Sequence, residues 1–314
     1  MIPSLHNGVS ALKSLTQGLQ VLGNNIANVN SLGYKAARAN YSDNFYMHLN
    51  DAEAGANGVP SNNIQQHGTG VHIGSISTDF NQGTHETTGL DLDLAIQGEA
   101  LPNGGGFFEV VDDNTGETFY TRAGAFEANE RELVVTRDQF EYKLQGSKGD
   151  IDLSKFIPPE PDAAQDPNKP FIPELGDYDS ILSRRIDEKG NIFLVVNRRV
   201  EDPNTNQLID NGDEIVKVGE IKIVNFGSPQ YLRKVGNGYY SNGRPGQNVA
   251  NIMDNTVPAK GSNGKIKQYA LELSNVDLTN EFANMISHQR SFQAGSRVIT
   301  TSDMILSEAV NLKR

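Results

Sequence analysis

The chain contains six histidines, the side chains that most often bind metals or transfer protons near neutral pH. They are His6, His48, His67, His72, His85 and His288. A helical zinc site needs two histidines four residues apart with a glutamate between them, and no such segment occurs. His67 and His72 stand five apart, which suits neither one helix face nor one strand face. We therefore expect no metal site.

Two acidic stretches have the residue types for calcium binding or acid–base chemistry. The first, Asp112–Glu117, lacks the alternating ligands and the distal glutamate of an EF-hand loop, so it favours a hairpin turn. In the second, Asp150 and Asp152 are spaced to share one face of a strand as a carboxylate pair. Because no neighbouring residues suggest a cleft, we interpret this pair as part of a solvated strand.

One glycine pattern resembles a dinucleotide-binding loop. Gly68, Gly70 and Gly74 place the last glycine one position late, and strand-like residues 71–73 follow where a helix is required. Nucleophile-elbow, P-loop and kinase motifs are absent from the sequence. With no residue set suited to catalysis, we expect a protein that is not an enzyme and uses no cofactor.

Composition excludes several further classes. The 314 residues contain no cysteine, so disulfides and thiolate chemistry are excluded, and the length allows two or three domains. A net charge of -12 argues against nucleic-acid binding, which needs a basic face. The first 50 residues carry three basic and one acidic side chain, and residues 272–314 carry four basic and five acidic ones, so the acidic excess lies in the middle of the chain.

Neither a membrane span nor a standard signal peptide is evident. The sequence has no continuous apolar run of the length that a transmembrane helix needs. Its N-terminus lacks the basic start, apolar run and cleavage site of a signal peptide. We therefore expect no membrane insertion, and export, if it occurs, by a route without a cleaved signal peptide.

Any site must be positioned by elements at the two ends and in the middle. Near the N-terminus, apolar residues at heptad spacing predict a helix of about 25 residues. They are Leu5, Val9, Leu12, Leu15, Leu19, Leu22, Ile26 and Val29. The other positions hold mostly small or uncharged residues, and glycines such as Gly8 and Gly18 each destabilise a helix by about 1 kcal/mol relative to alanine. We expect this helix to be ordered by packing on several sides.

A second helix is predicted at the C-terminus. Its apolar seam consists of Leu278, Phe282, Met285, Phe292, Ile299 and Leu306. Asp277 or Thr279 is suited to cap its start. Both seams also fit an ordinary helical pair packed on a core, but their location at the extreme ends favours a coiled coil that forms the core of self-assembly.

Between the helices the sequence predicts mainly β-structure. Alternating apolar runs such as residues 90–96 and 192–196 are separated by turn residues, and 157–173 is proline-rich and predicts a stiff linker or long loop. The fold prediction is therefore mainly β with terminal helices. Residues 1–45 and 272–314 form an inner helical domain, 46–156 with 257–271 a β-rich middle domain, and 157–256 an outer β/loop domain or insertion stacked outward.

Three stretches carry a family resemblance. The first holds Asn24, Asn25, Ile26, Ala27, Asn28, Gly33, Tyr34 and Lys35. The second comprises residues 79–84, 88–98, 106–108 and 120–126. The third comprises residues 274–278, 284–286, 289–294, 299–303 and 311–314. Together they resemble the bacterial flagellar rod and hook axial proteins. Residues 99–105 are an insertion relative to that family, and 157–264 has no counterpart that we can match.

The resemblance implies a structural protein whose terminal helices pair in an inner coiled-coil domain lining a hollow tube. It implies partners: further copies of the chain, the rod, hook-cap and hook–filament junction proteins, and the flagellar type III export apparatus. It places the protein in the flagellum, outside the cell after export. Residues 274–277 and 311–314 are more similar to the hook protein. A hook subunit acting as a universal joint is thus the main hypothesis, a distal or proximal rod protein the alternative, and a filament-associated adhesin or enzyme a third.

Overall fold

The computed structural model describes residues 3–51, 63–98, 102–129, 134–147, 149–151, 153, 180–201, 208–243, 252, 258–260 and 263–312. The chain divides into two compact units. The first contains Met1–Val29, Ala36–Asp79 and Val276–Arg314, and the second contains Asn30–Lys35 and Phe80–Asn275. The proline-rich segment 157–173 lies outside the described residues.

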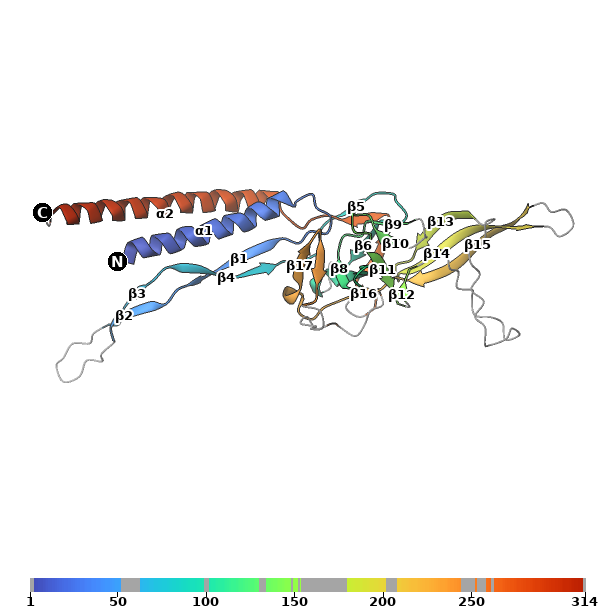
Figure 1. The fold of residues 1–314 in the computed structure, drawn as a ribbon, viewed down its shortest axis with the longest axis horizontal. Coiled ribbons are helices and arrows are strands. Elements are labelled where there is room, and N and C mark those ends of the chain that lie inside the picture. Colours follow the sequence, from blue (N-terminus) through green and yellow to red (C-terminus); the bar gives the residue numbers. More distant parts are fainter. Residues whose placement is uncertain are drawn as a thin grey trace. The chain divides into compact units, whose positions relative to one another are not determined.

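The first unit consists of two helices and two strand pairs (Figure 1). The helices are α1 (Pro3–Ala27) and α2 (Leu278–Leu312). The strands are β1 (Ala37–Asp43), β2 (Tyr46–Asn50), β3 (Gln65–Gly68) and β4 (Val71–Thr78), with β1 antiparallel to β4 and β2 antiparallel to β3. Asp277 caps α2, because its carboxylate accepts the backbone N–H of Thr279 at 2.9 Å.

The second unit is built around a nine-stranded antiparallel sheet. Its main path runs β17 (Arg233–Gly236), β18 (Tyr239–Ser241), β8 (Thr118–Thr121), β7 (Phe107–Val111), β11 (Lys143–Gly146), β10 (Val134–Thr136) and β9 (Phe126–Ala128). Two short strands join it, β12 (Gly149–Asp150) on β11 and β16 (Ile223–Val224) on β7. The predicted turn at 112–117 joins β7 to β8, and its start is held by the Asn114 N–H bonded to Asp112.

Three smaller sheets and two short 3-10 helices complete this unit. The sheets are β13 (Ser180–Ile186), β14 (Asn191–Glu201) and β15 (Leu208–Glu220); β6 (Leu94–Gln97) with β19 (Lys265–Gln268); and β5 (His85–Thr87) with β20 (Ala270–Glu272). The 3-10 helices are η1 (Pro102–Gly105) and η2 (Pro229–Tyr231). Figure 1 shows β13–β15 extending from one end of the unit. The prediction of a mainly β fold with a helix at each end is confirmed.

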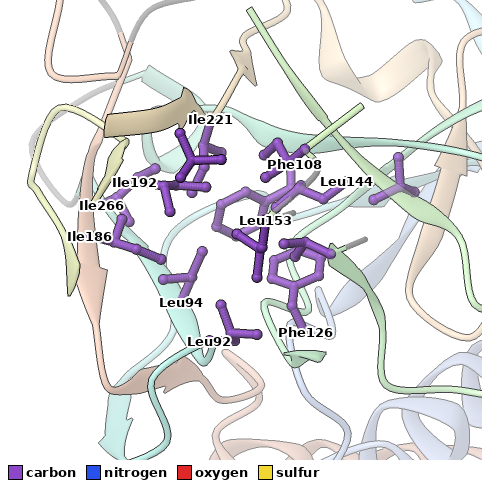
Figure 2. Close-up of a cluster of buried hydrophobic side chains, with 14 of the residues drawn as sticks. Leu92, Leu94, Phe108, Phe126, Leu144, Leu153, Ile186, Ile192, Ile221 and Ile266 are labelled. Carbon is purple, nitrogen blue, oxygen red and sulfur yellow. The ribbon is translucent and has the colours of Figure 1, made fainter. Parts of the chain in front are cut away.

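Two apolar clusters hold the second unit together. In the larger cluster, Leu94, Phe108 and Leu153 are fully buried and point toward one another (Figure 2). The second is mainly aromatic: Phe107 makes edge contacts with Phe80 and Phe226, with ring centroids 5.7 and 5.8 Å apart. Edge-to-face pairs of this kind add to the stabilisation that burial gives.

The two units group the strands differently from the three segments expected from the sequence. Residues 46–79 lie with the terminal helices, because β4 pairs with β1 directly after α1. Strands β16, β17 and β18, from the range expected to form an outer domain, join the sheet of β7 and β8. None of the helices in the described part of the chain has an apolar stretch long enough to cross a membrane.

The fully buried Phe108 should carry much of the stability of the second unit. We expect Phe108→Ala to lower the free energy of unfolding by about 3–5 kcal/mol, because the cavity left in the core cannot close fully. Phe140, which is half exposed, is the control. Phe140→Ala should cost about 1 kcal/mol or less, since it loses mainly one stacking contact with Tyr142. Urea unfolding followed by circular dichroism measures both, and equal losses would contradict this account of the core.

Candidate functional site

Three buried charged side chains meet in the second unit. The Lys35 ammonium lies 2.6 Å from one carboxylate oxygen of Glu272, and the Arg122 guanidinium lies 3.1 Å from the other. All three side chains are fully buried. We call this group the ion-pair junction. One carboxylate faces two cations, so the junction carries a net positive charge that must be stabilised by further groups.

Backbone dipoles and an aromatic ring supply that stabilisation. Lys35 also donates to the carbonyl of Asn81 at 2.7 Å, and the guanidinium of Arg122 lies 5.0 Å from the centre of the Phe107 ring. The Gly83 N–H donates to Glu272 at 2.9 Å. Each charge therefore has several partners, which is the condition under which a buried ion pair is tolerated.

The ionisation of Glu272 reflects this balance. Burial alone would raise the pKa of its carboxyl group. The charges of Arg122 and Lys35, with the hydrogen bonds from Lys35 and Gly83, outweigh burial and hold the pKa below its usual range. Glu272 is consequently a carboxylate throughout the physiological pH range.

The junction ties together the segments that lead into the first unit. The chain passes between the units at four points: after residues 29, 35, 79 and 275. Gly33 donates to the carbonyl of Glu272 at 2.8 Å, and Lys35 reaches Asn81. Asn275 donates from its side chain to Asn81 at 3.2 Å. Residues beside all four crossing points are thus bonded to one another inside the second unit.

Gly33 allows this close approach. Its φ of +62° is a left-handed conformation that favours glycine, and a Cβ atom here would lie 2.7 Å from backbone atoms of Arg122 and Ala123. The next residues are held from the other side, because Lys234 donates to the carbonyl of Lys35 at 2.9 Å and its ammonium lies 4.9 Å from the centre of the Tyr34 ring. Burial lowers the pKa of Lys234.

Asn25 is the buried member of the asparagine-rich signature. Its side-chain amide pairs with the backbone of Ala37, donating at 2.8 Å and accepting at 2.9 Å, as a strand neighbour would. The same amide donates to Glu281 of α2 at 3.2 Å. Asn24 is exposed, and Asn28 donates to its backbone carbonyl at the helix end. Ile26 is half-buried and Ala27 is exposed.

The apolar residues of the predicted α1 seam are not deeply buried within the chain. Leu5, Leu12, Leu15, Leu19, Leu22 and Ile26 are half-buried, and Val9 is exposed. The residues of α1 that are buried are instead Gly8, Ser14, Gly18 and Asn25. Ser14 donates to the carbonyl of Val71 in β4 at 3.0 Å, so one small and polar side of α1 faces the strands.

The apolar seam of α2 is more exposed to solvent than that of α1. Met285, Ile299 and Leu306 of its predicted seam are half-buried, whereas Leu278, Phe282 and Phe292 are exposed. Ile299 lies against Gly8 of α1, and Leu12 lies against Gly295. Near the other end of the pair, the Ser4 and Ser302 hydroxyls are 3.2 Å apart. The helices therefore lie side by side in this unit, with small and polar residues at many of their contacts (Figure 1).

Comparison with known proteins identifies the class. Residues 5–35 match the model "Flagella basal body rod protein", 102–194 match "Flagellar hook protein FlgE/F/G D1 domain", and 267–312 match "Flagellar basal body rod FlgEFG protein C-terminal". The chain is 34% identical to the flagellar basal-body rod protein FlgG of Bacillus subtilis, over the full length of both. The chain belongs to the flagellar rod and hook protein family, which is structural and not enzymatic.

Two relatives from one organism show the range within the family. The chain is 29% identical to the rod protein FlgG of Borreliella burgdorferi over 322 aligned positions. It is 26% identical to the hook protein FlgE of the same organism, over 449 aligned positions that cover all of both chains. The hook protein therefore needs long gaps in this chain, and the rod protein does not.

The ion-pair junction joins the three family segments. Lys35, Arg122 and Glu272 fall in the first, second and third matched segments, respectively. The sequence pattern identifies Lys35 as a signature residue but does not single out Arg122 or Glu272 as site residues. Their signal was a lone charge within an otherwise apolar strand context, such as Glu272 between Leu271 and Leu273.

Removing the central carboxylate should be strongly destabilising. We expect Glu272→Gln to lower the free energy of unfolding by about 3–5 kcal/mol, because two buried cations lose their counter-charge. The control is Glu188→Gln, whose partner Lys265 lies 2.7 Å away in an exposed pair. That change should cost about 0–1 kcal/mol. Denaturant titration at neutral pH decides, and a Glu272→Gln variant as stable as the control would show that the junction contributes little.

The junction also predicts a pH dependence. The folded-state pKa of Glu272 lies below its unfolded value, so its stabilisation is complete above an unfolded pKa of about 4.3 and is lost as pH falls through the lower, folded value. The difference in the free energy of unfolding between the wild type and Glu272→Gln should therefore be constant between about pH 6 and 8. It should become smaller in acid. A difference unchanged down to the acid unfolding limit would be inconsistent with an ionised Glu272.

Proposed function

We propose that this chain is a rod subunit of the bacterial flagellar basal body and polymerises through its terminal helices. The observation that carries the proposal is its end-to-end match to rod proteins without long gaps. From the sequence we expected a hook subunit, with the rod as the alternative. The comparisons support the rod alternative better, since alignment to the hook protein extends to 449 positions. The full-length match to that hook protein keeps the hook subunit as the second candidate.

The exposed apolar side chains of the helices support self-assembly. On α2, Ile286, Ile305 and Val310 are each more than half exposed, at 57%, 57% and 65%. A soluble monomer rarely leaves such a series of large apolar residues uncovered on one element, and extended apolar surface marks an interaction site. In the proposed polymer, second copies of the chain cover these residues, and the helices pair as a coiled coil.

The β2–β3 strand pair offers a second apolar surface in the same unit. Phe45 is 90% exposed, and its neighbours Tyr46, Met47 and Leu49 are all more than half exposed. We propose that this surface also contacts neighbouring copies. Burying it would contribute about 25 cal/mol for each Å² of apolar surface removed from water.

The partners follow from the family. Self-polymerisation and flagellar partners are implied by membership, and we propose other rod subunits and the type III export apparatus as the specific ones. Hook-cap and hook–filament junction proteins would be partners under the hook alternative. We propose a location in the basal body, reached by export without a cleaved signal peptide.

Deletion of the gene distinguishes a rod subunit from a hook subunit, because the two assignments predict different remaining structures. In the bacterium that encodes this chain, deletion should leave basal bodies with a shortened or missing rod and no hook, as seen by cryo-electron tomography. Expression of the wild-type chain from a plasmid should restore both structures. Complete rods that lack a hook would instead support the hook assignment, and intact flagella would contradict both.

A charge in the apolar seam of α1 should block assembly. We expect Leu12→Asp or Leu19→Asp to abolish polymerisation, because a carboxylate in the seam loses its hydration without gaining a partner. Leu182→Asp provides the matched control, since Leu182 is 54% exposed on β13 in the second unit. Polymer formation is measured by electron microscopy, and circular dichroism tests that the second unit remains folded. Normal polymers from a seam variant would show that α1 does not form the polymer core.

A further inference from the structure

The facing sides of α1 and α2 carry a repeating set of polar and small contacts. Ser4 contacts Ser302 at 3.2 Å, Gly18 lies against His288, and Asn25 donates to Glu281 at 3.2 Å. We call these three pairs the polar stripe. From one pair to the next, the residue number rises on α1 by the same amount as it falls on α2. Each of these spacings is a multiple of seven residues, which is one heptad. The helices are thus antiparallel in a single register.

The polar stripe is not optimised for stability. Among the described residues, Glu281 Oε2 and His288 Nδ1 are buried atoms without a hydrogen-bond partner. Leaving such atoms unpaired costs free energy that an apolar residue in the same place would not. A leucine at either position would lie beside the apolar seam, because Glu281 and His288 stand four residues before Met285 and Phe292 on the same side of α2. The sequence therefore keeps polar groups where apolar ones would pack at less cost.

Such placement is characteristic of a register determinant. An apolar heptad seam can slip by seven residues and still bury apolar residues against apolar ones, whereas one polar layer penalises each slipped arrangement. A register determinant is required in this helix pair, because the half-buried leucines of α1 and the exposed apolar residues of α2 could also pair in slipped registers. Asn25 is a strong anchor for the layer, since Ala37 fixes the same amide from the strand side.

We propose that the polar stripe makes α1 and α2 of one chain pair with each other in one register, in preference to slipped pairings and to pairing with helices of other copies. Glu281 and His288 act as specificity-determining residues for this pairing. The discrimination against other copies rests on the proposed function as a polymer subunit. The discrimination against slipped pairings within one chain does not.

Cysteine cross-linking tests the register directly, because the natural chain contains no cysteine. In the Ser4→Cys, Ser302→Cys variant, oxidation should give a monomer of altered mobility on a denaturing gel. Ser4→Cys with Ala309→Cys reports a slip of one heptad and should give little product. An equal mixture of Ser4→Cys chains and Ser302→Cys chains should give few cross-linked dimers. The reaction is run both on purified protein and on flagellated cells.

The stripe itself is tested by making it apolar. Combining Glu281→Leu with His288→Leu should reduce the ratio of in-register to slipped cross-links about tenfold. The control combines Asn284→Leu with Gln289→Leu, which adds the same apolar groups at exposed positions of α2 and should leave the ratio unchanged. Circular dichroism measures the helix content of each variant. A variant that fails to fold loses helical signal, whereas a variant that only changes register keeps it.

Three results would overturn the proposal. They are efficient cross-linking of the slipped pair in the otherwise unchanged chain, a cross-linked dimer as the main product of the mixed chains, and an unchanged ratio in the stripe variant. Failure of the rod assignment would be seen separately by tomography of the deletion strain, whereas the register measured on purified protein does not depend on which axial structure the chain builds.

Discussion

One carboxylate that faces two buried cations is the constraint on which the rest of the structure depends. Glu272 binds Lys35 and Arg122 where water does not reach them, and all three charges would be costly without the others. Glu272 also accepts the backbone N–H groups of Gly33 and Gly83, and the side chains of Lys35 and Asn275 both donate to the carbonyl of Asn81. The chain therefore places its most demanding electrostatics where the segments leading to α1, β1, β4 and α2 must be held together.

The two helices show a different arrangement from the ion-pair junction. Their contacts within the chain involve small and polar residues, such as Gly8, Gly18 and Ser302, while large apolar residues stay half-buried or exposed. Small residues let two helices approach closely without supplying much apolar burial of their own. The first unit consequently has unused apolar surface, whereas the second unit has two well-filled clusters. The second unit thus has an apolar core of its own, and the first unit leaves apolar side chains of both helices exposed.

The sequence was informative where periodicity decides the structure and less so where chemistry between distant residues does. Heptad spacing predicted both helices, and alternation predicted the mainly β middle, because each depends on local pattern. Spacing did not reveal that α1 buries Ser14 and Asn25 rather than its leucines, since the strands that cover this side are selected by tertiary packing. Glu272 and Arg122 lie 150 residues apart, and pairing across that distance leaves no periodic signal.

The order of the junction residues along the chain constrains folding. Lys35 and Arg122 are available early, but Glu272 lies near the C-terminus, directly before α2. Strands β19 and β20 bring this last segment onto β6 and β5, so the second unit closes only when contacts of long sequence separation form. These contacts also bring the Glu272 carboxylate to Lys35 and Arg122. Closure of the second unit and attachment of the segment that leads into α2 therefore depend on the same long-range contacts.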